Sequence, residues 1–231
     1  GGQADLQSGI LRAVGVPHQR FTEDALRILR LYRFAARFGF AIDPPTAQAA
    51  QELCAHLDCV SVERIEEELA KLLSAPAPAA YLDEKILGVV LPELSPEALA
   101  AAKPVVDACP AGAENLPIRL AALLLSLGED GTRRTLRRLR CSNACIEETA
   151  VLVREVVSGV PVSLNIYARR LLGKYNLCTV QRLAALGTAL QPEHAADFAA
   201  LSELAEQLDA DGVCCRVSQL AVNGRDLMAA G

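Results

Sequence analysis

Four arginines recur along one short segment at spacings that place them on one face of a helix. Arg27, Arg30, Arg33 and Arg37 are three, three and four residues apart, and residues at these spacings are neighbours on a helix surface. One interpretation is a solvated surface stripe. Like charges in such a row repel each other unless anions lie near them, so the alternative is a surface that binds phosphate groups.

Asp24 lies one helical turn before Arg27, so a carboxylate and a guanidinium are expected to project from the same side. An ordinary ion pair at this spacing stabilises an exposed helix by only about 0.2–0.5 kcal/mol. A fixed pair, however, also presents hydrogen-bond acceptors next to donors. Cytosine and adenine place an exocyclic amino donor beside a ring-nitrogen acceptor, whereas uracil and guanine place a carbonyl beside a ring N–H. The pair could therefore accept C and A and reject U and G, because the wrong bases leave buried charges unpaired.

The elements that must position these residues are predicted to be helices. Leu, Ala, Glu and Arg dominate, apolar residues recur three and four apart, and alternating strand-like runs are absent. A helix is expected over residues 22–38, with Thr22 as its N-cap and Gly39 at its end. Ser61 is expected to cap a helix over residues 62–73. Shorter helices are predicted at 79–88, 96–108, 116–127, 131–139, 143–157, 164–173, 177–190 and 192–208. The fold class is therefore all-α.

Composition is consistent with a cytoplasmic protein that carries local positive charge. Hydrophobic residues make up 52% of the 231 residues, yet no uncharged apolar run reaches the roughly 20 residues of a membrane helix. The first residues lack the layout of a signal or transit peptide, and the missing initiator Met suggests a start inside a longer reading frame. The net charge of −5 argues against nucleic-acid binding on average. Its arginines are segregated, however, so local phosphate binding remains open.

The cysteine and histidine positions predict no metal site. The eight cysteines include no C-x-x-C pair, and the three histidines form no cluster along the chain. Cysteine is also a common small buried residue in reducing compartments, so these thiols are expected to be inert.

A second basic cluster, on a predicted short helix, is a further candidate surface for binding RNA phosphates. Arg134 and Arg138 are one turn apart and could contact RNA phosphates. A solvated helix balanced by Glu147 and Glu148 explains the pattern equally well. The full cluster is Arg133, Arg134, Arg137, Arg138 and Arg140.

The segment around the arginine stripe resembles the neck signature of the bacterial-type (class II) tRNA CCA-adding enzymes and the closely similar bacterial poly(A) polymerases. The E-D-x-x-R motif of this family, its template for CTP and ATP, falls on Glu23, Asp24 and Arg27. Upstream, residues 1–15 resemble the family's G-G-x-x-D-L motif and the strand that closes its catalytic head. Downstream, residues 61–69 resemble a second neck motif.

The resemblance implies a role for each matching residue. Asp24 and Arg27 would select the base, and Glu23 would orient that pair. Glu63 and Arg64 would brace the template helix. Phosphates of the nucleotide or the RNA would be contacted by Arg12, Arg30, Arg33 and Arg37, with Arg134 and Arg138 in the second cluster.

Two departures from the family pattern bear on catalysis. The Gly-Ser start, the paired aspartates and the R-R-D motif of the catalytic head are absent. No catalytic residue is therefore assigned, and Mg²⁺ with CTP and ATP is expected only in an intact parent protein. Residues 119–128 resemble a segment of HD-type phosphohydrolases, but Leu125 and Ser126 replace the His-Asp pair. A hydrolase is therefore excluded, and this region is interpreted as a packing relic.

The resemblance implies consecutive helical subdomains in an elongated array. Residues 1–20 would be a remnant of the α/β head, 21–75 the neck, 76–160 a degenerate HD-like body, and 161–231 a partial tail. Residues 220–227 resemble a G-R-D-L segment that precedes a final helical stretch in the family, so the chain is expected to be cut at both ends.

The sequence thus predicts the RNA- and nucleotide-binding part of a CCA-adding enzyme, inactive alone and continuous with a catalytic head in the parent. Its expected partners are the tRNA 3′ end and acceptor arm, with CTP and ATP, and no membrane. Two alternatives remain: a poly(A) polymerase of the same family, and a non-catalytic helical RNA-binding or scaffold module.

Overall fold

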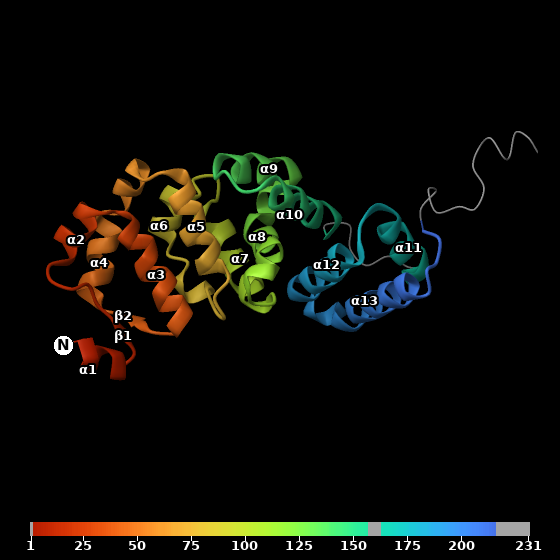
Figure 1. Ribbon diagram of the computed structural model, residues 1–231, viewed down its shortest axis with the longest axis horizontal. Helices are drawn as coiled ribbons and strands as arrows, with labels where there is room; N and C mark the ends of the chain where they lie inside the picture. The colour runs from red at the N-terminus through yellow and green to blue at the C-terminus, as the bar shows by residue number, and fades with distance from the viewer. Residues whose placement is uncertain (1, 157–162, 216–231) are drawn as a thin grey trace, which may run out of the picture. The chain divides into compact units, whose positions relative to one another are not determined.

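The computed structural model describes residues 2–156 and 163–215, and they are almost entirely helical (Figure 1). These residues form thirteen α-helices, five short 3-10 helices and one pair of two-residue strands. The predicted all-α class is confirmed. The chain divides into two compact units, residues 1–154 and 155–231, and no described helix is long and apolar enough to cross a membrane.

A small parallel strand pair ties the start of the chain to the end of the arginine helix. Ile10 of strand β1 pairs with Ala41 of strand β2, and Leu11 pairs with Ile42. The Ala41 N–H donates to the Gly9 carbonyl at 2.8 Å. The elements of this region are α1 (Gly2–Gln7), β1 (Ile10–Leu11), α2 (Pro17–Glu23), α3 (Leu26–Phe38) and β2 (Ala41–Ile42).

The single helix predicted over residues 22–38 is in fact two helices that meet at a corner. Asp24 adopts an extended conformation (φ −152°, ψ 100°) and ends α2, and its carboxylate accepts the Leu26 N–H at 3.2 Å. Thr22 is not the N-cap, because it lies in the last turn of α2 and donates its hydroxyl to the His18 carbonyl at 2.8 Å. Asp24 therefore caps the arginine helix, and Gly39 ends it with a left-handed φ of 66° as predicted.

Helix α3 packs its apolar side mainly against α5 (Val62–Leu73), which has the predicted bounds. Ser61 precedes α5 in an extended conformation, but its side chain makes no capping hydrogen bond, so that detail of the prediction is wrong. Along the chain, two further elements separate α3 from α5. They are α4 (Pro44–Glu52), capped by Asp43, and the 3-10 helix η1 (Cys54–Cys59). The buried residues of α3 are Leu26, Ile28, Leu29, Leu31, Tyr32, Ala35 and Ala36.

The rest of the first unit is a set of helices around the almost fully buried α8. The elements are η2 (Ala79–Tyr81), α6 (Glu84–Val90), α7 (Pro96–Ala108), η3 (Ala113–Asn115), α8 (Leu116–Leu124), η4 (Leu125–Leu127), α9 (Gly128–Arg138) and α10 (Asn143–Val156). Helix α8 buries every residue from Pro117 to Leu124, as expected for a helix that is apolar all round.

Arg119 of α8 is buried, and its guanidinium is surrounded by backbone carbonyls. It donates to Leu73 and Ala75 at the end of α5. It also donates to Cys109 and Pro110 beyond the end of α7, at 3.0 Å each. Carbonyls at a helix end have no partner within the helix, so one side chain satisfies two such ends. The segment interpreted as a packing relic therefore contains the residue that fastens α5 to α7.

The second unit contains three longer helices whose bounds are close to those predicted. They are α11 (Leu164–Lys174), α12 (Leu177–Leu190) and α13 (Ala195–Ala210), with η5 (Pro192–His194) between the last two. Gly187 lets α12 approach the ring of Phe198, because a Cβ there would lie 2.2 Å from a ring carbon. The G-R-D-L segment at residues 220–227 lies outside the described residues.

Candidate functional site

The corner between α2 and α3 brings Glu23 and Arg27 into direct contact. Nη1 of Arg27 donates to Glu23 Oε2 at 2.8 Å and to the Arg20 carbonyl at 3.3 Å. Nη1 of Arg20 approaches both oxygens of Glu23 at 3.1 Å. The Glu23 carboxylate is thus held between two guanidiniums, and Arg27 is oriented by Glu23.

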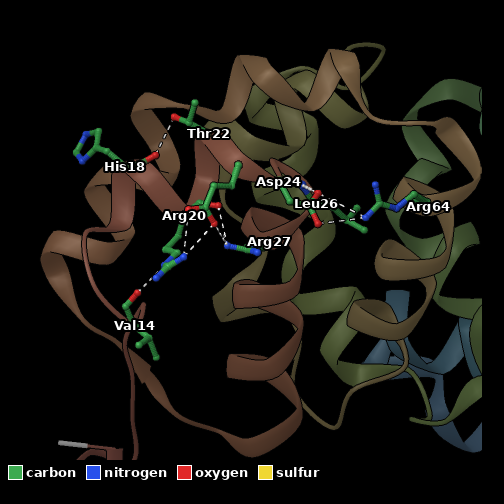
Figure 2. Close-up of polar contacts among 9 residues, drawn as sticks. Val14, His18, Arg20, Thr22, Asp24, Leu26, Arg27 and Arg64 are labelled. Atoms are coloured by element: carbon green, nitrogen blue, oxygen red, sulfur yellow. Dashed lines mark hydrogen bonds and ion pairs between the residues drawn. The ribbon is translucent and has the colours of Figure 1, made fainter.

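Asp24 is held by a different partner. Its Oδ2 accepts a hydrogen bond from Nη2 of Arg64, on α5, at 3.2 Å. Figure 2 shows the two groups turned apart, with Arg27 directed towards Arg20 and Asp24 towards Arg64. Asp24 and Arg27 therefore form no ordinary ion pair with each other. Both are fixed at the same end of α3, each by a separate contact.

A cavity of about 500 Å³ opens beside this corner. Its apolar part comes from residues such as Phe21, Leu31 and Phe34, and its basic part from arginines of α2, of α3 and of the turn after β1. A pocket with an apolar wall and a few placed polar groups is typical of a small-molecule site. The arginines that line it are Arg12, Arg20, Arg27 and Arg30.

Further along α3, two of the four arginines on its basic face contact the same buried carboxylate. Glu68 of α5 is only 4% exposed. Its Oε1 accepts from Nε of Arg30 at 3.2 Å, and its Oε2 lies 2.6 Å from Nε of Arg33. That second contact is a close ion pair without hydrogen-bond alignment, and the Arg33 guanidinium lies 3.8 Å from the ring centre of Phe34.

These contacts correct one part of the argument from sequence. The stripe was expected to need external anions because its charges repel each other. Instead, Glu23 pairs with Arg27, and Glu68 pairs with both Arg30 and Arg33, which reduces the repulsion but leaves one positive charge in excess around Glu68. The carboxylates come from α2 and from α5, about forty residues away, so the spacing of the arginines alone could not reveal them.

Hydrogen bonds to arginine shift the titration of the site carboxylates. The bonds from Arg27, and then from Arg20, lower the pKa of Glu23 below its usual 4.5. A bond from its own backbone and one from Arg140 lower the pKa of Glu63. A carboxyl whose folded pKa is lowered contributes stability above its unfolded pKa and loses it as the pH falls through the folded value. Both ion pairs are therefore intact at neutral pH and weaken only in acid.

The remaining predicted residues fall into two groups. Arg12 pairs with Asp43 at 2.9 Å, and Arg138 pairs with Glu93 at 2.7 Å. Arg37 and Arg134 are exposed on α3 and α9. Arg12 and Arg138 are exposed too, but Arg37 and Arg134 make no ion pair within the described part of the chain, so they can contact phosphates without first breaking one.

The predicted bracing residues make different contacts. Arg64 holds Asp24, as a brace of the α3 start should. Glu63 instead pairs with Arg140, which follows α9. This second contact links α5 to the basic cluster, a connection that the sequence did not suggest.

No cluster of three or more His, Cys, Asp or Glu among the described residues is arranged to hold a metal ion. No chemical step through a metal is derived from the described residues. Free thiols are present at Cys54, Cys59, Cys109, Cys141, Cys145 and Cys178. Burial raises the pKa of the Cys109 thiol to about 11, so it stays protonated.

The sequence missed one residue at this corner. The sequence analysis assigned no role to Arg20, although it lies three residues before Glu23, a spacing that allows contact on a helix. Its link to the Val14 carbonyl, at 2.9 Å, has no signal in the sequence because it depends on the turn before α2.

Comparison with protein families gives a match over part of the chain. Residues 39–97 match a family model described as "Probable RNA and SrmB- binding site of polymerase A". A CCA-adding enzyme of Streptococcus pneumoniae is 52% identical over 75 residues, which are 32% of this chain and 19% of that protein. A CCA-adding enzyme of Limosilactobacillus reuteri is 39% identical over 124 residues, which are 54% of this chain and 27% of that protein. The matches thus span about a fifth to a quarter of these relatives.

Solved structures resemble the chain over nearly its whole length. A CCA-adding enzyme of Bacillus stearothermophilus, crystallised in complex with CTP, superposes with a TM-score of 0.81 at 26% identity. The match covers 99% of this chain and 57% of that one. A Thermotoga maritima CCA-adding enzyme complexed with tRNA gives a TM-score of 0.65 at 18% identity, covering 100% of this chain and 57% of that one. This second likeness concerns the fold alone.

The helical fold, the arginine helix and these relatives make the chain similar to one class of protein, the tRNA nucleotidyltransferases. Within that class, its resemblance to the bacterial-type CCA-adding enzyme family is confirmed over a helical part of the chain.

The Glu68 contacts generate a stability prediction. Glu68→Ala leaves two guanidiniums beside an apolar interface, and removing one partner of a buried pair costs roughly 3 kcal/mol. The free energy of unfolding of unit 1, measured by urea denaturation, should fall by about that amount. The neighbouring Glu67→Ala is the matched control, because the Glu67 side chain is 62% exposed and its one ion pair within the described ranges is with Lys71. It should cost less than about 0.5 kcal/mol. Equal losses in the two variants would contradict a central role for Glu68.

Proposed function

We propose that this chain is the nucleotide-template and RNA-binding part of a tRNA nucleotidyltransferase that adds C, C and A to tRNA 3′ ends. One observation carries the proposal. Asp24 and Arg27 stand at the same end of α3, each fixed by a separate partner, and Arg27 lines a basic cavity. A base bound across the start of α3 would meet the held guanidinium of Arg27, which lines the cavity, and the held carboxylate of Asp24, which lies outside the cavity lining.

The geometry favours selection by hydrogen bonding. Among the described residues, both hydrogen bonds of Arg27 run from Nη1, so Nη2 and Nε remain for a ligand. Asp24 Oδ2 can accept an exocyclic amino group beside them. Cytosine and adenine satisfy both groups, whereas uracil and guanine would place a carbonyl against the carboxylate. A site that leaves charged groups unpaired rejects the wrong ligand strongly.

The phosphate contacts are assigned by which arginines already have a carboxylate partner among the described residues. Arg37 and Arg134 would meet RNA phosphates directly. Arg12, Arg30 and Arg33 would lie near the triphosphate, with Asp43 and Glu68 keeping them oriented. Arg138 would bind an RNA phosphate after its ion pair with Glu93 breaks.

Catalysis would be supplied by a head that is covalently continuous with this chain in a longer protein. That head would bind Mg²⁺ and direct the tRNA 3′-hydroxyl at the α-phosphate of CTP or ATP. The proposed division is a head remnant at 1–20, a neck at 21–75, a body at 76–160 and a partial tail at 161–231. The chain alone is expected to be inactive, and CMP incorporation by the chain alone would contradict this assignment.

Two alternatives have different consequences. A poly(A) polymerase of the same family would use the same corner but add only A, so incorporation assays with CTP and ATP in parallel separate it. A non-catalytic RNA-binding module would use the arginines without selecting a base. In that case Asp24 would serve only to cap α3.

The base-selection proposal predicts the effect of changing Asp24 in the longer protein. Asp24→Asn keeps an oxygen for the Leu26 N–H, so α3 remains capped, but it adds amide donors where the base must donate. The preference for C and A over U and G should fall about 100-fold, measured as kcat/KM for each nucleotide. Asp58→Ala, at an exposed carboxylate of η1, is the control and should leave that preference intact. An unchanged preference in Asp24→Asn would favour the scaffold alternative.

The phosphate assignment predicts salt-dependent binding by the chain itself. A labelled tRNA without its CCA end, titrated by fluorescence anisotropy, should bind more weakly as the salt rises. Arg37→Ala and Arg134→Ala should each reduce the slope of log K against log salt by about 0.9. Lys71→Ala is the control, since Lys71 pairs with Glu67 on α5. Failure of the folded chain to bind, or an unchanged slope in both variants, would remove these two arginines from the RNA contact.

A further inference from the structure

Arg20 occupies the junction between the turn that follows β1 and the base-selecting corner. Its Nε donates to the Val14 carbonyl at 2.9 Å. Its Nη1 donates to Oε1 and Oε2 of Glu23 at 3.1 Å each. One planar guanidinium therefore spans two structural elements, a geometry that a single ammonium cannot reproduce.

The contacts continue from Glu23 to Arg27. Glu23 Oε2 accepts from Arg27 Nη1 at 2.8 Å, and the carbonyl of Arg20 accepts from the same nitrogen at 3.3 Å. Arg20 thus acts on Arg27 twice, through its side chain and through its own carbonyl at the end of α2. Figure 2 shows this line of contacts from Val14 through Arg20 to Arg27.

The turn that Arg20 holds is also a wall of the cavity. Residues 12–14, Arg20 and Arg27 all line it. Gly15 makes the turn with a left-handed φ of 84°, and a Cβ there would lie 3.6 Å from Nη2 of Arg20, an ordinary contact. A shift of this turn would move Arg20 and, through Glu23, the guanidinium that faces the ligand.

We propose that Arg20 is a positioning residue for nucleotide selection: it ties the turn at residues 12–16 to Glu23 and so fixes Arg27 against the base. This inference rests on the proposed function. It adds a role for a residue outside the base-reading pair and couples the shape of the cavity wall to the choice of base. Arg20 itself need not touch the base.

The charge environment supports this chain of contacts. The pKa of Glu23 is lowered by its bonds to Arg27 and Arg20, so the two arginines extend to lower pH the range in which the carboxylate is ionised. Glu23 is about half exposed, and an exposed ion pair contributes little to stability. The value of Arg20 therefore lies in orientation, and its loss should change selectivity more than folding.

The first test uses this chain without any activity. Arg20→Gln removes the charge and one arm of the fork. The Glu23 carboxyl, followed by carbon NMR through a pH titration, should then titrate at a higher pH than in wild type. Glu52 is an internal control, because its lowered pKa depends on His18 and Gln48 and should not change. An unchanged Glu23 titration would overturn the proposed contact.

The second test uses the longer protein. Arg20→Gln should reduce the kcat/KM preference for C and A over U and G by about ten-fold, with a smaller loss in kcat for the best substrate. Arg20→Lys keeps the charge near Glu23 but cannot span to Val14, so it should recover part of that preference. Arg169→Ala, at an exposed arginine of α11 that bonds Asn165, should behave as wild type.

The outcomes separate this inference from the function on which it rests. A wild-type longer protein that shows no preference among the four nucleotides would overturn the proposed function, and this inference with it. A wild-type protein that selects C and A, together with an Arg20→Gln variant that selects equally well, would overturn only the role of Arg20. Equal losses of kcat for all four nucleotides would indicate a purely structural role and would also reject the proposal.

Discussion

The carboxylate of Glu68, on α5, lies in the interface between α5 and α3. There it forms ion pairs with the guanidiniums of Arg30 and Arg33. Burying one carboxylate beside two arginines is favourable because both of its oxygens are paired, while the one excess positive charge reaches solvent through Arg30, whose side chain is 45% exposed. The same two helices are joined at the other end of the interface by Arg64 and Asp24. These contacts fix the direction of α3, and with it the groups that α3 presents to the cavity.

The ends of helices could be predicted from the sequence where a capping or helix-terminating residue marks them. Helix α5 begins and ends at the predicted residues, and Gly39 ends α3 in the left-handed conformation. The corner at Asp24 could not be found, because residues 17–38 keep helical composition throughout and the break depends on one backbone conformation. The partner of β1 was also missed, since a two-residue strand carries no periodicity and is defined by pairing alone.

The candidate site residues were proposed from the sequence, whereas the contacts between them were not. Spacing identified the arginine stripe, and the resemblance to a known family identified Glu23, Asp24 and Arg27. The counter-ions were not predictable, because Glu68 and Arg64 reach α3 from about forty residues away. The role of Arg20 depends on a backbone carbonyl, which no pattern of side chains can reveal. Sequence thus supplied the chemistry of the site, while the fold determined which charges remain available to a ligand.

The most direct test of the central claim is a structure of the longer protein with CTP bound. The account predicts that Asp24 accepts the exocyclic amino group of cytosine while Arg27 donates to the ring nitrogen, with Glu23 still bonded to Arg27 and Arg64 still bonded to Asp24. A cytosine bound away from the start of α3, or read by other residues while Asp24 and Arg27 remain as they are here, would contradict the account.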